Sequence, residues 1–96
     1  MPLSRAEIAT ASGERIINRL CKHWAHKLEV EHTQQDAKIL FPDMGTCVMH
    51  AEPAVLSVSI ETQEKEHLDK LEGVVESHLV RMAKDEALTV IWKSQA

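Results

Sequence analysis

Aromatic residues are scarce in this 96-residue sequence, which has one Phe, two Trp and no Tyr. Surfaces built from stacked rings are therefore nearly absent, and the core must be packed mainly with aliphatic side chains and Met. Glycine is also scarce, and the three glycines, at positions 13, 45 and 73, form neither a GxGxxG motif nor a Walker A loop. The sequence therefore predicts no nucleotide cofactor.

No apolar run approaches the length of about 18 residues that a membrane-spanning helix needs, so we expect no membrane span. At the N-terminus, Arg5 and Glu7 interrupt the stretch that a secretory signal peptide would keep apolar. These absences predict a cytoplasmic protein. In that compartment Cys21 and Cys47 are expected as thiols or metal ligands rather than as a disulfide.

Composition and length fit one ordinary globular domain, expected over residues 1–96, since hydrophobic residues make up 44% and charged residues 27%. The net charge of −4 is unevenly divided: residues 1–28 carry five basic and two acidic side chains, whereas residues 29–96 carry six and thirteen. General affinity for nucleic acid is not expected at this overall acidity. The basic N-terminal third can attract an acidic partner.

Hydrophobic periodicity predicts an edge strand over 3–10, then a helix over 13–28 that begins at Ser12. The apolar stripe of this helix consists of Ile16, Ile17, Leu20, Cys21, Trp24 and Leu28. The period then changes to two, which predicts four strands, at 28–33, 37–41, 46–51 and 55–61. Turns are expected at 34–36, 43–45 and 52–54.

A second helix is predicted from Thr62 to about Lys84, with Leu68, Leu71 and Leu79 on its apolar stripe. Residues 88–92 alternate but are apolar on both faces, which predicts a closing strand in the centre of the sheet. The resulting order is β-α-β-β-β-β-α-β. We therefore expect an α+β fold, a two-layer sandwich in which two helices pack on one face of a largely antiparallel sheet.

Histidines are the most conspicuous candidates for chemistry, with six in the chain. His23 and His26 are three residues apart on the first helix, a spacing that lets both side chains reach one metal ion such as zinc or iron. A third ligand must come from elsewhere, and we take Cys47 as the leading candidate, with His32, His50 and His78 as alternatives. The competing interpretation makes Cys21 a small buried hydrophobe and His26 a solvated side chain.

The first helix also carries a basic ridge opposite its apolar stripe, formed by Arg15, Arg19, Lys22 and His26. This ridge is a candidate surface for an acidic protein partner, or else a solvated face that keeps the helix soluble. On the second helix, His78 falls among apolar residues and is expected to be largely buried. It is then either a hydrogen-bonded core histidine or a polar group directed into a pocket.

Several separated blocks resemble the bacterial DUF2218 family: LCKHWAHKL at 20–28, Phe41-Pro42, Gly45-Thr46-Cys47, VVESHLVR at 74–81 and Trp92. The resemblance implies a compact bacterial domain without an established function, whose members sometimes occur beside genes for siderophore-dependent iron uptake. The polar and thiol residues that it carries over are Cys21, Lys22, His23, His26, Lys27, Cys47 and His78. Met82 and Lys84-Asp85 depart from the stretch that the family has there.

These features predict a non-enzymatic cytoplasmic accessory or binding domain, linked to iron or siderophore handling and contacting its partner through the basic ridge. The alternative is a small metal-binding protein that uses His23 and His26 with a strand ligand. No GxSxG elbow is present and nothing in the sequence identifies a nucleophile. An enzyme that uses Cys47 or His78 is therefore the least favoured class.

Overall fold

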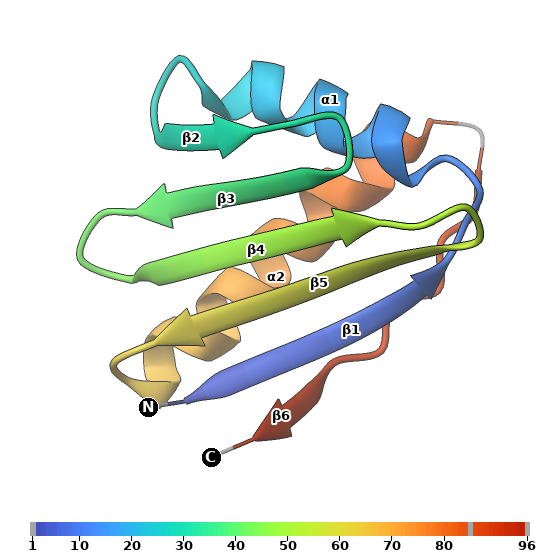
Figure 1. The fold of residues 1–96 in the computed structure, drawn as a ribbon. Coiled ribbons are helices and arrows are strands. Elements are labelled where there is room, and N and C mark those ends of the chain that lie inside the picture. Colours follow the sequence, from blue (N-terminus) through green and yellow to red (C-terminus); the bar gives the residue numbers. More distant parts are fainter. Residues whose placement is uncertain (1, 85, 96) are drawn as a thin grey trace.

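The protein folds as a six-stranded antiparallel sheet with two helices on one face, as the computed structural model shows for residues 2–84 and 86–95 (Figure 1). The strands lie in the order β2-β3-β4-β5-β1-β6. The elements along the chain are β1 (Leu3–Ala9), α1 (Gly13–Trp24), β2 (Glu29–His32), β3 (Asp36–Phe41), β4 (Gly45–Ala51), β5 (Val55–Thr62), α2 (Lys65–Ala83) and β6 (Lys93–Gln95). The predicted α+β class and element order are confirmed.

The core lies between the sheet and the helices and follows from the period-two alternation of the strands. Ile8 on β1, Ile39 on β3, Met49 on β4 and Ile60 on β5 are fully buried on the face that the helices cover. The neighbours of these residues in sequence point to the opposite, open face. A slip of one residue in any strand would exchange the two sets, so burial of one face fixes the register.

Each helix covers its own part of the sheet: α1 packs against β2, β3 and β4, and α2 packs against β5 and β1. The predicted stripe of α1 is buried up to Trp24. The helix ends there rather than at Leu28, and residues 25–27 form a turn in which the Lys27 amide donates to the Trp24 carbonyl at 3.0 Å, a bond between residues three apart. Within the described residues, no helix is long and apolar enough to cross a membrane.

A tight turn joins β3 to β4 and sets their register. Asp43 has a φ of 63°, and Phe41 pairs with Gly45 across the turn. A Cβ on Gly45 would collide with the Glu61 carbonyl and with the side chain of Thr62. Glycine is therefore required at position 45, where β4 passes close to the backbone of β5.

Two predictions about the end of the sheet are wrong. The N-terminal strand is not an edge, since β1 lies between β5 and β6. The closing strand is neither central nor located at 88–92: β6 is a three-residue edge strand, and residues 88–92 are irregular. Their outward side chains face water, with Ile91 64% exposed, so an apolar residue on each face did not signify a central strand here.

Candidate functional site

The predicted basic ridge is divided by the structure into an exposed part and a structural residue. Arg15, Lys22 and His26 are exposed on α1 and on the turn that follows it. Arg19 is partly buried, and its Nη1 donates to the Met82 carbonyl at 2.8 Å. The last carbonyls of a helix lack partners within the helix, so Arg19 caps the end of α2 and ties the two helices together.

The three exposed residues, Arg15, Lys22 and His26, form the basic surface of α1. Across residues 2–84 and 86–95, both ion pairs that form involve His50, so no carboxylate neutralises the basic surface.

A cluster of rings lies where α1 meets α2. The ring centroids of His23 and His78 are 5.4 Å apart, and those of Trp24 and His78 are 4.9 Å apart. His78 Nδ1 lies 2.7 Å from the Val74 carbonyl oxygen, which can only accept, so Nδ1 is the donor and Nε2 remains available. His78 is partly buried at the margin of the contact between the helices.

The predicted metal ligands lie in different environments. His23 and His26 are exposed, whereas Cys47 is fully buried on the covered face of β4. The ring of His23 lies beside that of His78, which is on the other helix. Within the described part of the chain, no three His, Cys, Asp or Glu side chains come close enough to hold a metal ion.

Both thiols are free and buried, as expected for a protein without a disulfide. Burial raises the pKa of the Cys21 thiol and raises that of Cys47 far more strongly, because Cys47 is fully enclosed. The nearby Cys21 adds to the increase in the pKa of Cys47. Since the thiolate is the reactive form, neither cysteine is activated as a nucleophile.

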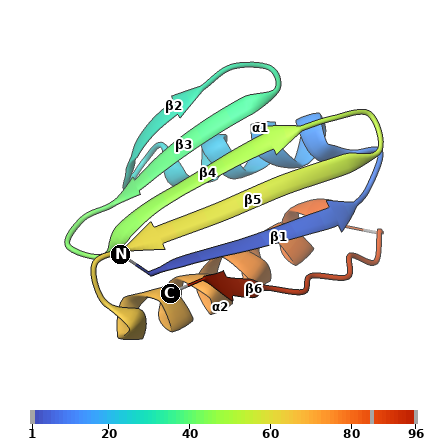
Figure 2. The ribbon, with the colours of Figure 1, turned by 60° about the horizontal axis from the view of Figure 1, so that its bottom comes forward.

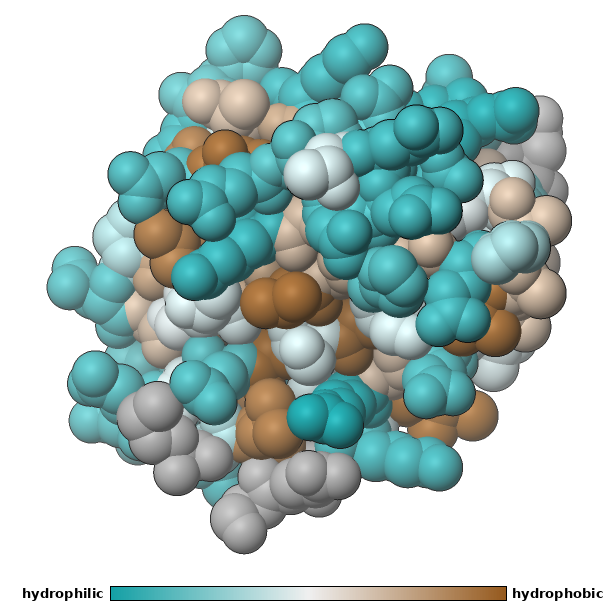
Figure 3. Space-filling view, viewed as in Figure 1, coloured by the Kyte–Doolittle hydropathy of each residue, from teal (hydrophilic) through white to brown (hydrophobic). Residues whose placement is uncertain are grey.

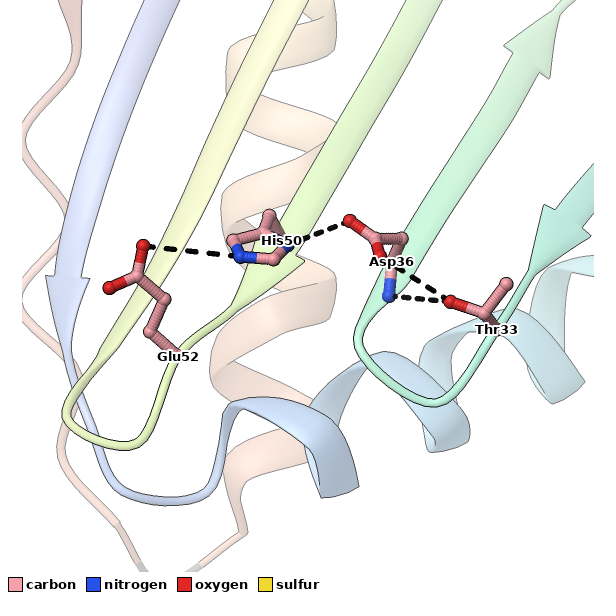
Figure 4. Close-up of polar contacts among 4 residues, drawn as sticks. All are labelled: Thr33, Asp36, His50 and Glu52. Carbon is pink, nitrogen blue, oxygen red and sulfur yellow. Dashed lines mark hydrogen bonds and ion pairs between the residues drawn. The ribbon is translucent and has the colours of Figure 1, made fainter.

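A polar group that the sequence did not reveal lies on the open face of the sheet (Figure 4). His50 Nδ1 is 2.7 Å from Asp36 Oδ1, and His50 Nε2 is 3.9 Å from Glu52 Oε1. Thr33 holds Asp36 in place, since the Asp36 amide donates to Thr33 Oγ1 at 3.1 Å. The imidazole of His50 therefore lies between two exposed carboxylates and is hydrogen-bonded to that of Asp36.

The register of three strands places this group beside a shallow hollow. Asp36 is opposite His50, and His50 is opposite Ser57. The hollow has a volume of about 220 Å³, and its lining includes His50, Ser57 and Arg5. Within the described residues, His50 Nε2 has no hydroxyl partner, so the arrangement can bind a polar group but does not form a nucleophilic triad.

Figure 3 shows that the open face is mostly hydrophilic, with separate hydrophobic spots rather than one continuous apolar patch. Val48, at the centre of β4, is one of the exposed apolar side chains, at 43% exposure. Isolated apolar residues of this kind are normal on a protein surface.

Comparison with known proteins places the chain in a family. The model of the family described as "Uncharacterized protein conserved in bacteria (DUF2218)" matches residues 5–93. The chain belongs to the DUF2218 family. Among solved structures, this DUF2218 protein is similar to the NMR structure of PA4090 from Pseudomonas aeruginosa, with 38% sequence identity, a TM-score of 0.82, and coverage of 97% of this chain and 96% of that one. No curated protein sequence matches it.

In this DUF2218 chain, the residues carried over from the resemblance fall into three groups. Cys21 and Cys47 lie in the core, and His23 meets His78 between the helices. The side chains of Lys22, His26 and Lys27 are exposed at the end of α1. Of the residues that depart from the family pattern, Met82 and Lys84 lie at the end of α2, and Asp85 lies outside the described residues.

Proposed function

We propose that this DUF2218 chain is a non-enzymatic binding domain that docks an acidic protein partner on the basic surface of α1. The observation that carries the proposal is that Arg15, Lys22 and His26 are exposed together on α1 and on the turn that follows it, in a chain whose net charge is −4. Exposed cations without internal partners can attract an acidic surface from solution. Arg19 contributes by fixing α1 against α2.

In this proposal the domain acts in the cytoplasm. Its partner belongs to iron or siderophore handling, because members of the family it resembles sometimes occur beside genes for siderophore-dependent iron uptake. A binding role also agrees with the chemistry of the buried groups. The raised pKa values of Cys21 and Cys47 keep both thiols protonated, and among the described side chains no hydroxyl is hydrogen-bonded to His50.

The experiment compares two variants with the same change in charge. Arg15→Glu with Lys22→Glu reverses the basic surface, whereas Lys38→Glu with Lys65→Glu reverses two exposed lysines elsewhere. Untagged partner proteins captured from a bacterial lysate would be identified by mass spectrometry. We expect the first variant to lose capture of an acidic protein by at least tenfold, and the second to retain it.

Arg19 is left unchanged, because replacing it would also disturb the end of α2. Added salt should weaken the interaction, since exposed charges are screened over about 8 Å at physiological ionic strength. Equal capture by both variants, with melting temperatures close to that of the natural chain, would contradict the proposal.

The alternative, a small metal-binding protein, is favoured by the contact between His23 and His78. Zinc or iron would then be held by His23 with His78 or His26 and would need further ligands from outside the chain. Elemental analysis of the untagged protein separates the two functions. Stoichiometric metal that raises the melting temperature, and that is lost on His23→Gln but not on His67→Gln, would favour the alternative.

A further inference from the structure

The two sides of β1 are paired to very different extents. On one side β1 pairs with β5 along all seven residues, from Leu3↔Glu61 to Ala9↔Val55. On the other side it pairs with β6 at only three positions, from Leu3↔Gln95 to Arg5↔Lys93. Over the described residues, Ala6–Ala9 therefore have no strand partner on this side, and their outward backbone groups form a free edge.

The C-terminal segment, residues 88–92, has the burial pattern of a strand although it forms no ladder. Leu88, Val90 and Trp92 are half-buried and pack against the core, whereas Thr89 and Ile91 are exposed. Trp92 is also attached to α2, since its Nε1 donates to Glu76 Oε1 at 3.0 Å. The segment is thus held close to the sheet without being part of it.

Continuation of the β6 register would pair this segment with the free edge. From Arg5↔Lys93, the next pairs would be Ala6 with Trp92, Glu7 with Ile91, Ile8 with Val90 and Ala9 with Thr89. In every pair the two residues share a face: Ala6 and Ile8 point to the covered face, as do Trp92 and Val90. The sequence therefore already has the alternation that a longer β6 needs.

The ladder stops at a pair of like charges. Arg5 and Lys93 are direct cross-strand partners, and both are exposed on the open face. Like charges placed directly opposite each other destabilise strand pairing. Beyond this point the segment diverges from β1 (Figure 2), and a hollow of about 530 Å³ lies between Arg5, Ala6 and Glu7 on one side and Ile91 and Lys93 on the other.

We propose that the free edge of β1 at Ala6–Ala9 is a docking site for an extended peptide, for which the C-terminal segment of the same chain competes. The peptide adds to the sheet as a strand, through backbone hydrogen bonds to β1. Its chemistry follows from the register: apolar side chains at alternate positions replace Val90 and Trp92 on the covered face, and the peptide ends opposite Ala6, because Lys93 already occupies the position opposite Arg5. This site lies near the β6 edge of the sheet, whereas α1 covers β2, β3 and β4 toward the other edge. The proposal of a peptide site therefore does not depend on the function proposed for the basic surface.

The competing pairing of residues 89–92 with the free edge of β1 is tested by cross-linking. Glu7→Cys with Ile91→Cys places two thiols at direct partners of the extended register, within the Cα separation of 4.4 to 6.8 Å that a disulfide requires. The control is Glu7→Cys with Thr89→Cys, a diagonal pair expected at about 7 to 8 Å. We expect the first pair to oxidise at least tenfold faster. Equal rates would overturn the proposed register and, with it, the proposal.

The docking site is tested with the same disulfide, which would hold the C-terminal segment on the edge of β1 and so block the site. The probe is a synthetic peptide that copies residues 86–92, EALTVIW. In the full-length reduced protein it should shift the amide NMR signals of Ala6–Ala9, and a peptide of scrambled sequence should not. Oxidation of the Glu7→Cys/Ile91→Cys protein should weaken binding at least tenfold, and reduction should restore it. Absence of binding to the reduced protein, or equal binding to both forms, would overturn the proposal.

Discussion

The two faces of the sheet place opposite demands on neighbouring residues of the same strand. On β4, Cys47, Met49 and Ala51 are buried beneath the helices, whereas Val48 is exposed on the other face and His50 is partly so. The covered face is determined by the exclusion of water and contains almost only apolar side chains. The open face is free of that constraint, and it is where His50 meets Asp36 and where Arg5 lies opposite Lys93.

The largest expected change in the free energy of unfolding comes from a substitution on the covered face. Met49→Ala leaves a cavity among fully buried side chains and should lower the free energy of unfolding by about 2 to 5 kcal/mol. Val48→Ala, one residue away on the open face, should change it by about 0.5 kcal/mol or less. Denaturant unfolding of both variants measures the difference. Similar losses for the two would show that the open face is covered by something in solution.

A second, smaller effect concerns the thiol of Cys47. Its pKa in the folded protein is raised by burial, so the unfolded chain releases the proton first as the pH rises. The stabilising contribution is thus complete below about pH 8.5 and declines above it, by at most about 1.4 kcal/mol per pH unit. Unfolding at pH 7.5 and 9.5 should show this decline. In Cys47→Ala the decline should be smaller than in Cys21→Ala, and identical slopes in the two variants would contradict the assignment.

The smallest effect belongs to the open face. Asp36→Asn removes the carboxylate charge from the 2.7 Å contact with His50, but both side chains are more than 40% exposed, so the loss should be at most about 1 kcal/mol. Glu52→Gln, whose carboxylate is 3.9 Å from His50 Nε2, should have less effect still. A double-mutant cycle with His50→Gln measures each coupling. A coupling that persists in high salt would show that the group is less exposed than described.

Much of the fold was predictable because it depends on local patterns. The stripe from Ile16 to Trp24 and the alternation of β5 each require one buried face, and the sequence shows both directly. The position of β1 was not predictable in the same way. An amphipathic strand of seven residues has the same sequence pattern at the edge of a sheet as in its interior. Only the pairing of β1 with both β5 and β6 shows that it is an interior strand.

The His50 group depends on a turn whose position was predicted one residue too late. A turn at 43–45 would place Asp36 opposite Glu52, whereas the observed pairing of Phe41 with Gly45 places Asp36 opposite His50. The clash that a side chain at position 45 would make with β5 requires glycine after the turn rather than within it. The contact between His23 and His78 was beyond sequence reasoning, because it depends on how the two helices approach each other.

The place of β1 in the sheet also sets an order of assembly. The strands from β2 to β5 pair with their neighbours in sequence, whereas the partners of β1 on β5 lie 46 to 58 residues further along the chain. Closing a longer loop costs more chain entropy, so pairings between distant residues form more slowly than hairpins. Although β1 precedes the other strands of this sheet in the chain, it is therefore expected to join the sheet after the hairpins that follow it, and β5 remains an exposed edge until it does.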